Sequence, residues 1–332
     1  MTTVIVTGAA GFIGYHTSMR LMEKGFNVVG IDNLNDYYSV DLKMARLDSL
    51  MSSKLSHLFT FYKEDISDLD KISEIFKKEN PKYVVNLAAQ AGVRYSIENP
   101  QAYIDSNITG FLNILNCCRD QKVLHLVYAS SSSVYGNSKD VPFSTNSEVN
   151  KPVSIYAASK VTNELMAHVY SYQYGLPTTG LRFFTVYGPM GRPDMAPMKF
   201  ASSIINNKEI DVYNNGDHWR DFTYVDDIVS GVVKVMEKPC FIDENGDSLP
   251  VQNKVYNIGA QTPVHLMKFI ELIEKELGVK AVKKMLPMQL GDVKVTSANV
   301  DDLIRDHSYS PKTKLEDGIS EFITWFKSYE SK

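Results

Sequence analysis

A glycine-rich turn near the N-terminus constrains the fold of this chain more than any other feature. The segment TGAAGFIG places Gly8, Gly11 and Gly14 directly after the apolar run Thr3–Thr7 and at the start of a helical segment. Glycines here allow a tight turn and close approach of the backbone to a pyrophosphate, and the helix N-terminus offers N–H donors to phosphates. The turn therefore predicts a dinucleotide site at the end of a first β-strand.

A carboxylate at the end of the second predicted strand indicates which dinucleotide binds. Asp32 follows the apolar run Asn27–Ile31, where it can accept both ribose hydroxyls of an adenosine and would repel a 2′-phosphate. No arginine lies within 32–38, so the site favours NAD over NADP. Asp65 and Ile66 end the third predicted strand and are placed to meet the adenine, a surface turn being the alternative for Asp65.

Apolar runs alternate with helical segments through the first half of the chain, which predicts a doubly wound parallel sheet. The strands predicted to be buried are Thr3–Thr7, Asn27–Ile31, Thr60–Tyr62, Tyr83–Leu87 and His125–Ala129, and a further strand is Thr178–Phe184. The predicted helices are Thr17–Lys24, Leu69–Lys78, Ile108–Arg119, Ala157–Tyr174 with Gly175 as its C-cap, Leu266–Leu277 and Leu315–Tyr329. The prolines and glycines of GPMGRPDMAP (188–197) predict a loop that leads into a less regular region.

Charge and composition exclude several kinds of partner. A formal net charge of −4 argues against a nucleic-acid protein held by phosphate contacts. No window approaches the roughly 20 apolar residues of a membrane span, and the N-terminus lacks the basic region of a signal peptide. Cys117, Cys118 and Cys240 lack ligand-like spacing, so we expect reduced thiols in a cytoplasmic protein. The scattered histidines predict no catalytic metal.

The segment SIYAASK puts Tyr156 and Lys160 at positions i and i+4, on one face of a helix. A tyrosine with a pKa of about 10 is a poor base at neutral pH, but a neighbouring ammonium and the positive charge of NAD+ would lower that pKa. A plain helix with a surface lysine is the alternative for this pair alone. The serine-rich strand end YASSSSVYG (128–136) upstream, together with the glycine turn, favours a catalytic site.

These features together resemble the extended short-chain dehydrogenase/reductase family over almost the whole chain. The matching positions are the glycine turn, Asp32, Ser131, Tyr156, Lys160 and RFFTVYGP (182–189). The resemblance implies that Ser131 bonds the reacting sugar hydroxyl, that Tyr156 is the base, and that Lys160 binds the nicotinamide ribose and tunes the tyrosine. The NAD contacts that it implies are Gly8, Gly11, Phe12, Ile13, Gly14, Asp32, Asn33, Asn35, Asp36, Asp65, Ile66, Leu87, Ala88, Ala89, Asn107, Tyr156, Lys160 and Phe183.

Two serines distinguish the chain from family members that do more than move a hydride. Sugar-nucleotide dehydratases have Asp-Glu where this chain has Ser132 and Ser133, because loss of water needs an acid and a base. UDP-glucuronate decarboxylases have Glu where Ser133 stands. A site without a carboxylate here can still take a hydride and return it, which is the task of an epimerase.

Thr185 and Arg192 indicate the sugar. The 4-epimerases of UDP-glucose have Asn where Thr185 stands, whereas Thr185 and Arg192, with LNDYYSVDLK (34–43) and LAAQAGVRYSIENP (87–100), resemble the UDP-glucuronate 4-epimerases. There the matching Thr and Arg bind the sugar carboxylate, which a planar guanidinium pairs well. A surface or phosphate-binding arginine is the alternative for Arg192.

The rest of the substrate site is implied by the same resemblance. Arg220 matches an arginine that contacts the diphosphate, Tyr213 lies where the base packs, and Asp292 matches a carboxylate that meets the uridine ribose. Gln289 replaces an arginine of the UDP-glucose relatives, which would leave more of the diphosphate charge to Arg220. The complete predicted set is Arg94, Ser132, Ser133, Thr185, Arg192, Tyr213, Arg220 and Asp292; a structural role is equally open for Arg94.

The fold class that follows is α/β, a Rossmann-type doubly wound parallel sheet with a smaller, interleaved C-terminal α/β domain. Residues 1–181 and about 222–260 are assigned to NAD binding, and about 182–221 and 261–332 to UDP-sugar binding. Apolar stripes on 108–118 and 161–169 suit either plain core or the four-helix interface of a homodimer, which is usual in this family.

The predicted activity is reversible C4 epimerisation of UDP-glucuronate to UDP-galacturonate through a 4-keto intermediate, with bound NAD as cofactor. A 4-epimerase of a neutral UDP-hexose is the first alternative, and a UDP-glucuronate decarboxylase the second. From another class, an NAD-binding regulator without activity is opposed by the intact set Ser131, Tyr156 and Lys160.

Overall fold

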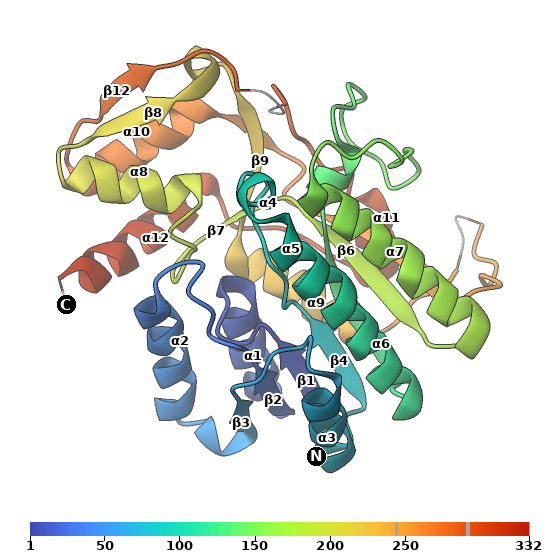
Figure 1. Ribbon diagram of the computed structural model, residues 1–332. Coiled ribbons are helices and arrows are strands. Elements are labelled where there is room, and N and C mark those ends of the chain that lie inside the picture. The colour runs from blue at the N-terminus through green and yellow to red at the C-terminus, as the bar shows by residue number, and fades with distance from the viewer. Residues whose placement is uncertain (243–244, 290–292, 332) are drawn as a thin grey trace.

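Seven parallel strands form the centre of the structure, a computed structural model that describes residues 1–242, 245–289 and 293–331. Their order is β10-β6-β5-β4-β1-β2-β3, and helices cover both faces (Figure 1). The strands are β1 (Thr3–Thr7), β2 (Asn27–Ile31), β3 (Phe59–Tyr62), β4 (Tyr83–Asn86), β5 (His125–Ser131), β6 (Thr178–Phe183) and β10 (Asn253–Ile258). The doubly wound α/β fold predicted from the sequence is confirmed.

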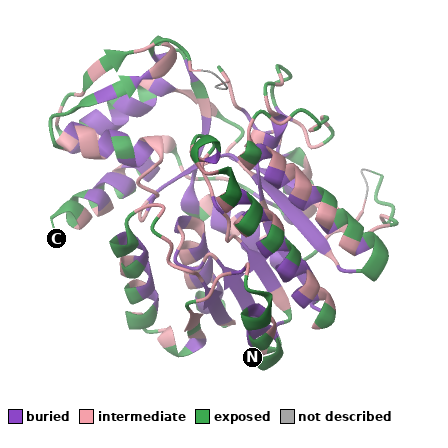
Figure 2. Ribbon diagram, in the orientation of Figure 1, coloured by how far each residue is buried: buried purple, intermediate pink, exposed green. Residues whose placement is uncertain are grey.

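Successive side chains of the first strand enter separate cores on the two faces of the sheet. The helices that build these cores are α1 (Phe12–Glu23), α9 (Val225–Glu237), α3 (Leu69–Glu79), α6 (Phe111–Asp120) and α7 (Ile155–Tyr174). Val4 and Val6 pack with α1 and α9, whereas Ile5 packs with α3, α6 and α7. Burial on both faces explains why the central strands are unbroken apolar runs (Figure 2).

Several elements differ from their predicted form. Helix α1 begins at Phe12 rather than Thr17, because the third glycine of the turn, Gly14, already lies inside the helix. A π-helix, η2 (Ile104–Gly110), precedes α6. Strand β3 was predicted to be buried, but its residues are mostly half-exposed because it is the edge strand and pairs only with β2.

The chain leaves the central sheet after β6 and forms a second group of elements at one end of the molecule (Figure 1). Its strands are β7 (Thr185–Tyr187), β8 (Glu209–Val212), β9 (Trp219–Tyr224), β11 (Pro263–His265) and β12 (Val282–Met285), in sheets ordered β11-β9-β7 and β12-β8. Its helices are α8 (Ala196–Ile205), α10 (Leu266–Leu277) and α12 (Leu315–Glu330), with α11 (Asp301–His307) beside β10. Beyond the 188–197 loop this second group therefore forms two small sheets and not a continuation of the central sheet.

The remaining elements that begin at the carboxyl edge of the central sheet are α2 (Val40–Ser52), α4 (Tyr95–Glu98), α5 (Pro100–Tyr103) and η3 (Ser132–Tyr135). The short helix η1 (Ser56–Leu58) directly precedes β3 at the opposite edge, and η4 (Tyr213–Gly216) follows β8 in the second group. After β9 the chain returns to the central sheet through α9 and β10, so the two groups of elements are interleaved in sequence. Within the described ranges, none of the helices is both long and apolar enough to cross a membrane.

Candidate active site

A cavity of about 1090 Å³ lies between the carboxyl edge of the central sheet and the second group of elements. Strand β1 is flanked by β2 on one side and β4 on the other, so the connections leaving this point run in opposite directions. Parallel α/β sheets bind ligands at such a switch point, because the loops diverge there and leave a crevice. The position of the cavity follows from the strand order.

The glycine turn forms one wall of this cavity, and its backbone excludes side chains. Gly8 has a φ of +69°, a conformation that side chains disfavour. A Cβ on Gly14 would lie 1.9 Å from the carbonyl oxygen of Gly8, and one on Gly11 would lie 2.9 Å from it. The turn and the first turn of α1 therefore pack with no space for side chains, and their N–H groups can face a pyrophosphate.

The Asp32 carboxylate supports the same turn from β2. Oδ2 accepts the N–H of Ala10 at 3.0 Å, and Oδ1 accepts that of Leu34 at 2.9 Å. Burial raises the pKa of Asp32, although these bonds and the charges of Lys43 and Arg46 oppose the rise. Each oxygen keeps a second lone pair for a ribose hydroxyl. Asp32 lines the cavity, as the predicted NAD contact requires.

Asp65 is both a turn residue and part of the cavity wall. It accepts hydrogen bonds from the Asn33 side chain at 2.6 Å and from the backbone and hydroxyl of Ser67 at 2.8 and 2.7 Å. Burial raises the pKa of this carboxyl, but the three hydrogen bonds outweigh burial, and the pKa lies below its usual range. The surface-turn interpretation and the predicted place beside the adenine are thus compatible.

The four serines after the β5 apolar run point to different sides. Ser130 donates a hydrogen bond to Glu164 at 2.5 Å, beneath the sheet edge, where Glu164 also pairs with buried Arg182. Ser131 lies on the cavity side, as alternation along a strand requires, and its Oγ accepts the N–H of Ser133 at 3.2 Å. Ser132 and Ser133 follow in η3, and all four serines contribute to the cavity lining, although the Ser130 hydroxyl is directed at Glu164.

Tyr156 and Lys160 share a face of α7, as predicted, and both line the cavity. Burial raises the pKa of Tyr156, a hydrogen bond with Ser131 and the charge of Arg192 lower it, and Asp194 raises it. The Lys160 ammonium donates to the Ala129 carbonyl oxygen at 2.8 Å, and burial lowers its pKa to about 8.

The Lys160 ammonium is directed at a carbonyl oxygen of β5, and Ser131 and Arg192 lower the pKa of Tyr156 in this structure. The tuning of Tyr156 by Lys160 stays a prediction.

Arg192 enters the cavity from the loop between β7 and α8. Its Nε donates to Asp194 Oδ1 at 3.0 Å and its Nη2 to Oδ2 at 2.5 Å, and Tyr37 donates its hydroxyl to the same Oδ2 at 3.2 Å. The pKa of Arg192 is lowered by burial, but the charge of Asp194 outweighs burial and raises it overall. Thr185, at the start of β7, lines the same cavity.

Arg94, Tyr213 and Arg220 also line the cavity. The guanidinium carbon of Arg94 is 5.4 Å from the centre of the Tyr213 ring, a cation–π distance. Arg220, on β9, donates to the carbonyl oxygens of Trp219 and Lys294 at 3.1 Å each. Asp292 lies outside the described residues.

Of the predicted site residues that the structure describes, all but Asn107 and Asp36 line the cavity. The predicted residues that line the cavity are Gly8, Gly11, Phe12, Ile13, Gly14, Asp32, Asn33, Asn35, Asp65, Ile66, Leu87, Ala88, Ala89, Arg94, Ser131, Ser132, Ser133, Tyr156, Lys160, Phe183, Thr185, Arg192, Tyr213 and Arg220. Asn107 lies behind the wall, because its side-chain amide bonds the Gln90 backbone at 2.7 and 3.0 Å and the Ser159 hydroxyl at 2.9 Å. Asp36 is exposed and lies outside the lining.

Helix α2 contributes two basic side chains that sequence reasoning missed. Lys43 donates to the backbone and side-chain oxygens of Asn35 at 2.6 and 2.7 Å. Arg46 is fully buried and donates to Ala10 O at 2.8 Å, to the Tyr38 hydroxyl at 2.7 Å and to Met190 O at 2.7 Å. The available signal was their position: both fall at helical spacing on the buried stripe of α2.

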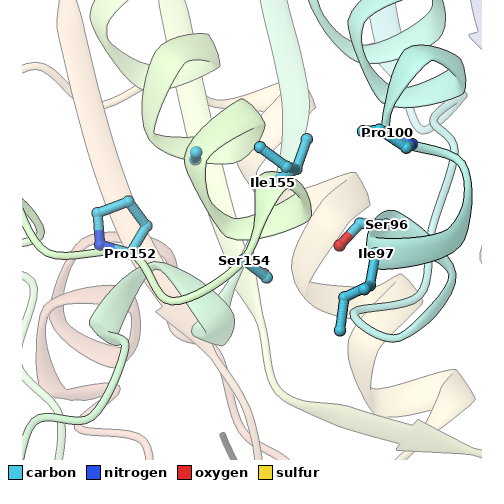
Figure 3. Close-up of a pocket in the computed structure, with 7 residues that line it drawn as sticks. Ser96, Ile97, Pro100, Pro152, Ser154 and Ile155 are labelled. Atoms are coloured by element: carbon cyan, nitrogen blue, oxygen red, sulfur yellow. The ribbon is translucent and has the colours of Figure 1, made fainter.

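A second, shallower hollow lies on the outer surface between α4, α5 and the start of α7 (Figure 3). Its lining is Ser96, Ile97, Pro100, Pro152, Ser154, Ile155 and Ala158. Among the described residues that form it there is no titratable side chain, so the hollow offers apolar surface rather than acid–base chemistry.

Comparison with known proteins identifies a matching family and several similar proteins. The model of the NAD dependent epimerase/dehydratase family matches residues 4–259. The chain is 52% identical to Protein CapI of Staphylococcus aureus over 99% of both chains. It is 43% identical to UDP-glucuronate 4-epimerase 4 of Arabidopsis thaliana over 99% of this chain and 76% of that one. The structure of UDP-glucuronic acid 4-epimerase from Bacillus cereus, in complex with UDP-glucuronic acid and NAD, has 32% identity, a TM-score of 0.89 and coverage of 99% of this chain and 100% of that chain.

Proposed function

The chain belongs to the NAD-dependent epimerase/dehydratase family, and from that premise we propose that it interconverts UDP-glucuronate and UDP-galacturonate by inversion at C4. The observation that carries the proposal is the presence of Arg192 and Thr185 in the cavity that also holds Ser131, Tyr156 and Lys160. An arginine fork recognises a carboxylate, which is what separates a uronate from a neutral hexose. Relatives with this activity by name support the assignment.

The residues present fit NAD as the cofactor. The glycine turn leaves backbone N–H groups and no side chains at the predicted pyrophosphate position, and Asp32 lines the cavity where a ribose would lie. Bound NAD would supply the oxidised nicotinamide that accepts the C4 hydride and, once reduced, the hydride that goes back to the opposite face of C4, so no net oxidation would result. Lys160 would reach the nicotinamide ribose from α7, and Ile66 and Asp65 would lie beside the adenine.

Tyr156 and Ser131 are the proposed catalytic residues. Tyr156 removes the 4-hydroxyl proton as the base, and Ser131 hydrogen-bonds that oxygen and the phenol. The 4-keto sugar then turns within the cavity while the UDP group is held by Arg220 and Tyr213. The proposed extent of the NAD part is 1–181 with about 222–260, and that of the UDP-sugar part about 182–221 with 261–332.

Ser132 and Ser133 also suit a reaction in which the substrate keeps its carboxylate. A 4-keto uronate is a β-keto acid. It loses CO2 when the bond from the ring to the carboxylate stands perpendicular to the plane of the C4 carbonyl. Hydrogen bonds from Ser132, Ser133, Thr185 and Arg192 would hold the carboxylate near that plane. The absence of a carboxylate side chain at 132 and 133 leaves no acid–base pair there for elimination of water.

The assembly proposed for the enzyme is a homodimer formed through α6 and α7. These helices pack against each other and expose apolar side chains, among them Leu112 (38%), Leu165 (63%) and Val169 (45%). Two such pairs would bury these faces in a four-helix bundle. The cysteines are free thiols, as a cytoplasmic location would require.

The decisive test is to mix the purified protein with UDP-glucuronate and follow the products by NMR. The expected result is UDP-galacturonate without release of CO2 and without accumulation of NADH. A UDP-pentose would show decarboxylation instead. Turnover of UDP-glucose but not of UDP-glucuronate would refute the assignment of Arg192 to a sugar carboxylate.

A further inference from the structure

Asp194 occupies one edge of the guanidinium that the proposed function assigns to the substrate carboxylate. The contacts at Nε and Nη2 form a two-bond pair, and Nη1 takes part in neither bond. A guanidinium offers a second two-donor edge formed by Nη1 and Nη2, in the same plane. Asp194 thus leaves this end-on edge of Arg192 available to another carboxylate.

The carboxylate of Asp194 is itself held from the opposite wall of the cavity. Tyr37 donates to Oδ2, and its ring packs on Tyr95 with centroids 4.8 Å apart. The tyrosine hydroxyl lies against Gly92, where a Cβ would come within 2.4 Å of the oxygen and where φ is +100°. The path from Gly92 through Tyr37 to Asp194 therefore fixes the plane of the Arg192 guanidinium.

We propose that Asp194 is a positioning residue that sets selectivity for an acidic sugar, an inference that rests on the proposed function. It holds Arg192 side-on, so that the end-on edge points at the sugar carboxylate with its plane already fixed. A misplaced fork would lose one of its two bonds to the uronate but would not affect a neutral sugar. Asp194 therefore acts on C6 recognition and not on the UDP anchor.

The Arg192–Asp194 pair also influences the pKa of the proposed base, Tyr156. The polar and titratable groups around the Tyr156 ring are Ser131, Tyr103, Lys160, Arg192 and Asp194. Arg192 lowers the pKa of Tyr156 and Asp194 raises it. Removing the Asp194 charge would leave that of Arg192 unopposed, so the pKa of Tyr156 would fall.

The test compares two ligands that share UDP and differ at C6. With Asp194→Asn, we expect the KM for UDP-glucuronate to rise about tenfold, while the inhibition constant of UDP-glucose as a competitor changes less than about twofold. Because the phenolate is the active form of Tyr156, the acidic limb of the kcat/KM profile should move to lower pH. A loop that was merely loosened would produce no such shift.

Two further variants keep the test decisive. Tyr37→Phe keeps the Arg192–Asp194 ion pair but removes the hydrogen bond from Tyr37 to Asp194, so it should raise the KM for UDP-glucuronate by a smaller factor. This variant tests the inference if Asp194→Asn folds poorly. Asp48→Asn removes an exposed carboxylate of α2 and should change neither ligand constant.

Three outcomes would overturn the inference. An Asp194→Asn enzyme that binds UDP-glucuronate more tightly would mean that Asp194 competes with the substrate for Arg192. Equal weakening of both ligands with an unmoved pH limb would mean a structural role alone. Failure of the unaltered protein to turn over UDP-glucuronate would instead refute the proposed function, on which the inference rests.

Discussion

In the proposed function, substrate choice depends on Arg192, the cation of the cavity that is directed at C6. Arg192→Ala should lower kcat/KM for UDP-glucuronate by about 100-fold, because a two-bond, charge-assisted contact is lost. The inhibition constant of UDP-glucose should stay within a few-fold. Steady-state assays with both ligands check this, and Arg192→Lys is the matched control, since it keeps the charge and loses the fork. Equal losses for both ligands would contradict a role at C6.

Lys160 carries a conflict between stability and function. Its pKa is near 8 in the folded chain, against 10.5 when exposed, so below pH 8 the folded protein holds a buried charge that the unfolded chain hydrates. Between these values the unfolded state binds more protons, and stability rises with pH. Lys160→Met should therefore stabilise the NAD-free protein, fully below pH 8 and progressively less towards pH 10.5.

Thermal unfolding of NAD-free protein at several pH values measures this difference. Lys312→Met, at an exposed site, controls for the loss of a positive charge. A gap between Lys160→Met and the unaltered protein that grows above pH 8 would contradict the sign of the pKa shift. The variant should also be inactive, because Lys160 is proposed to bind the nicotinamide ribose.

Among the elements, α2 connects the glycine turn to the 188–197 loop through the side chain of Arg46. Arg46 donates to Ala10 in the glycine turn and to Met190 in the loop that carries Arg192. Arg46→Met would leave these buried carbonyl oxygens without their donor, at a cost of about 3 kcal/mol in the free energy of unfolding. Affinity for NAD and for UDP-glucuronate should fall together.

Chemical denaturation and titration of NAD by fluorescence test the role of α2. Arg20→Met is the matched control, because Arg20 is half-exposed on α1 and forms a surface ion pair with Glu23 at 3.2 Å. A variant at 46 that loses stability but binds both ligands normally would mean that the arginine serves packing and not the alignment of the loops.

How far each element could be predicted depends on whether its signal is local. The strands of the central sheet follow from apolar runs, and the catalytic spacing from i, i+4 geometry. The role of Arg46 could not be read in this way, because its partners lie 36 and 144 residues away. Asp194 likewise gains its meaning only when Tyr37, 157 residues earlier, is placed beside it. Asn107 was predicted to contact NAD but does not line the cavity. Its side-chain amide instead bonds the buried backbone of Gln90.

At the scale of the whole molecule, α6 and α7 share a face with exposed apolar side chains, among them Leu112, Leu165 and Val169. Its apolar side chains continue to the hollow between α4, α5 and α7, where Ile97 is 79% exposed (Figure 3). A second copy of the chain would cover this face by two-fold symmetry, each α6–α7 pair packing on the other. Since α7 also carries Tyr156 and Lys160, the dimer would support the catalytic helix from its outer side.

Leu165→Glu should convert the proposed dimer to a monomer, because each copy would bury a carboxylate in the interface without a partner. Light scattering after gel filtration measures the mass directly. Leu124→Glu is the control, since Leu124 is 54% exposed but lies at the amino end of β5 and not on α6 or α7. The monomer should also lose thermal stability and turnover, because the outer face of α7 would be solvated. A Leu165→Glu protein that keeps the mass of two chains would place the interface elsewhere, and an unaltered protein with the mass of one chain would exclude the dimer.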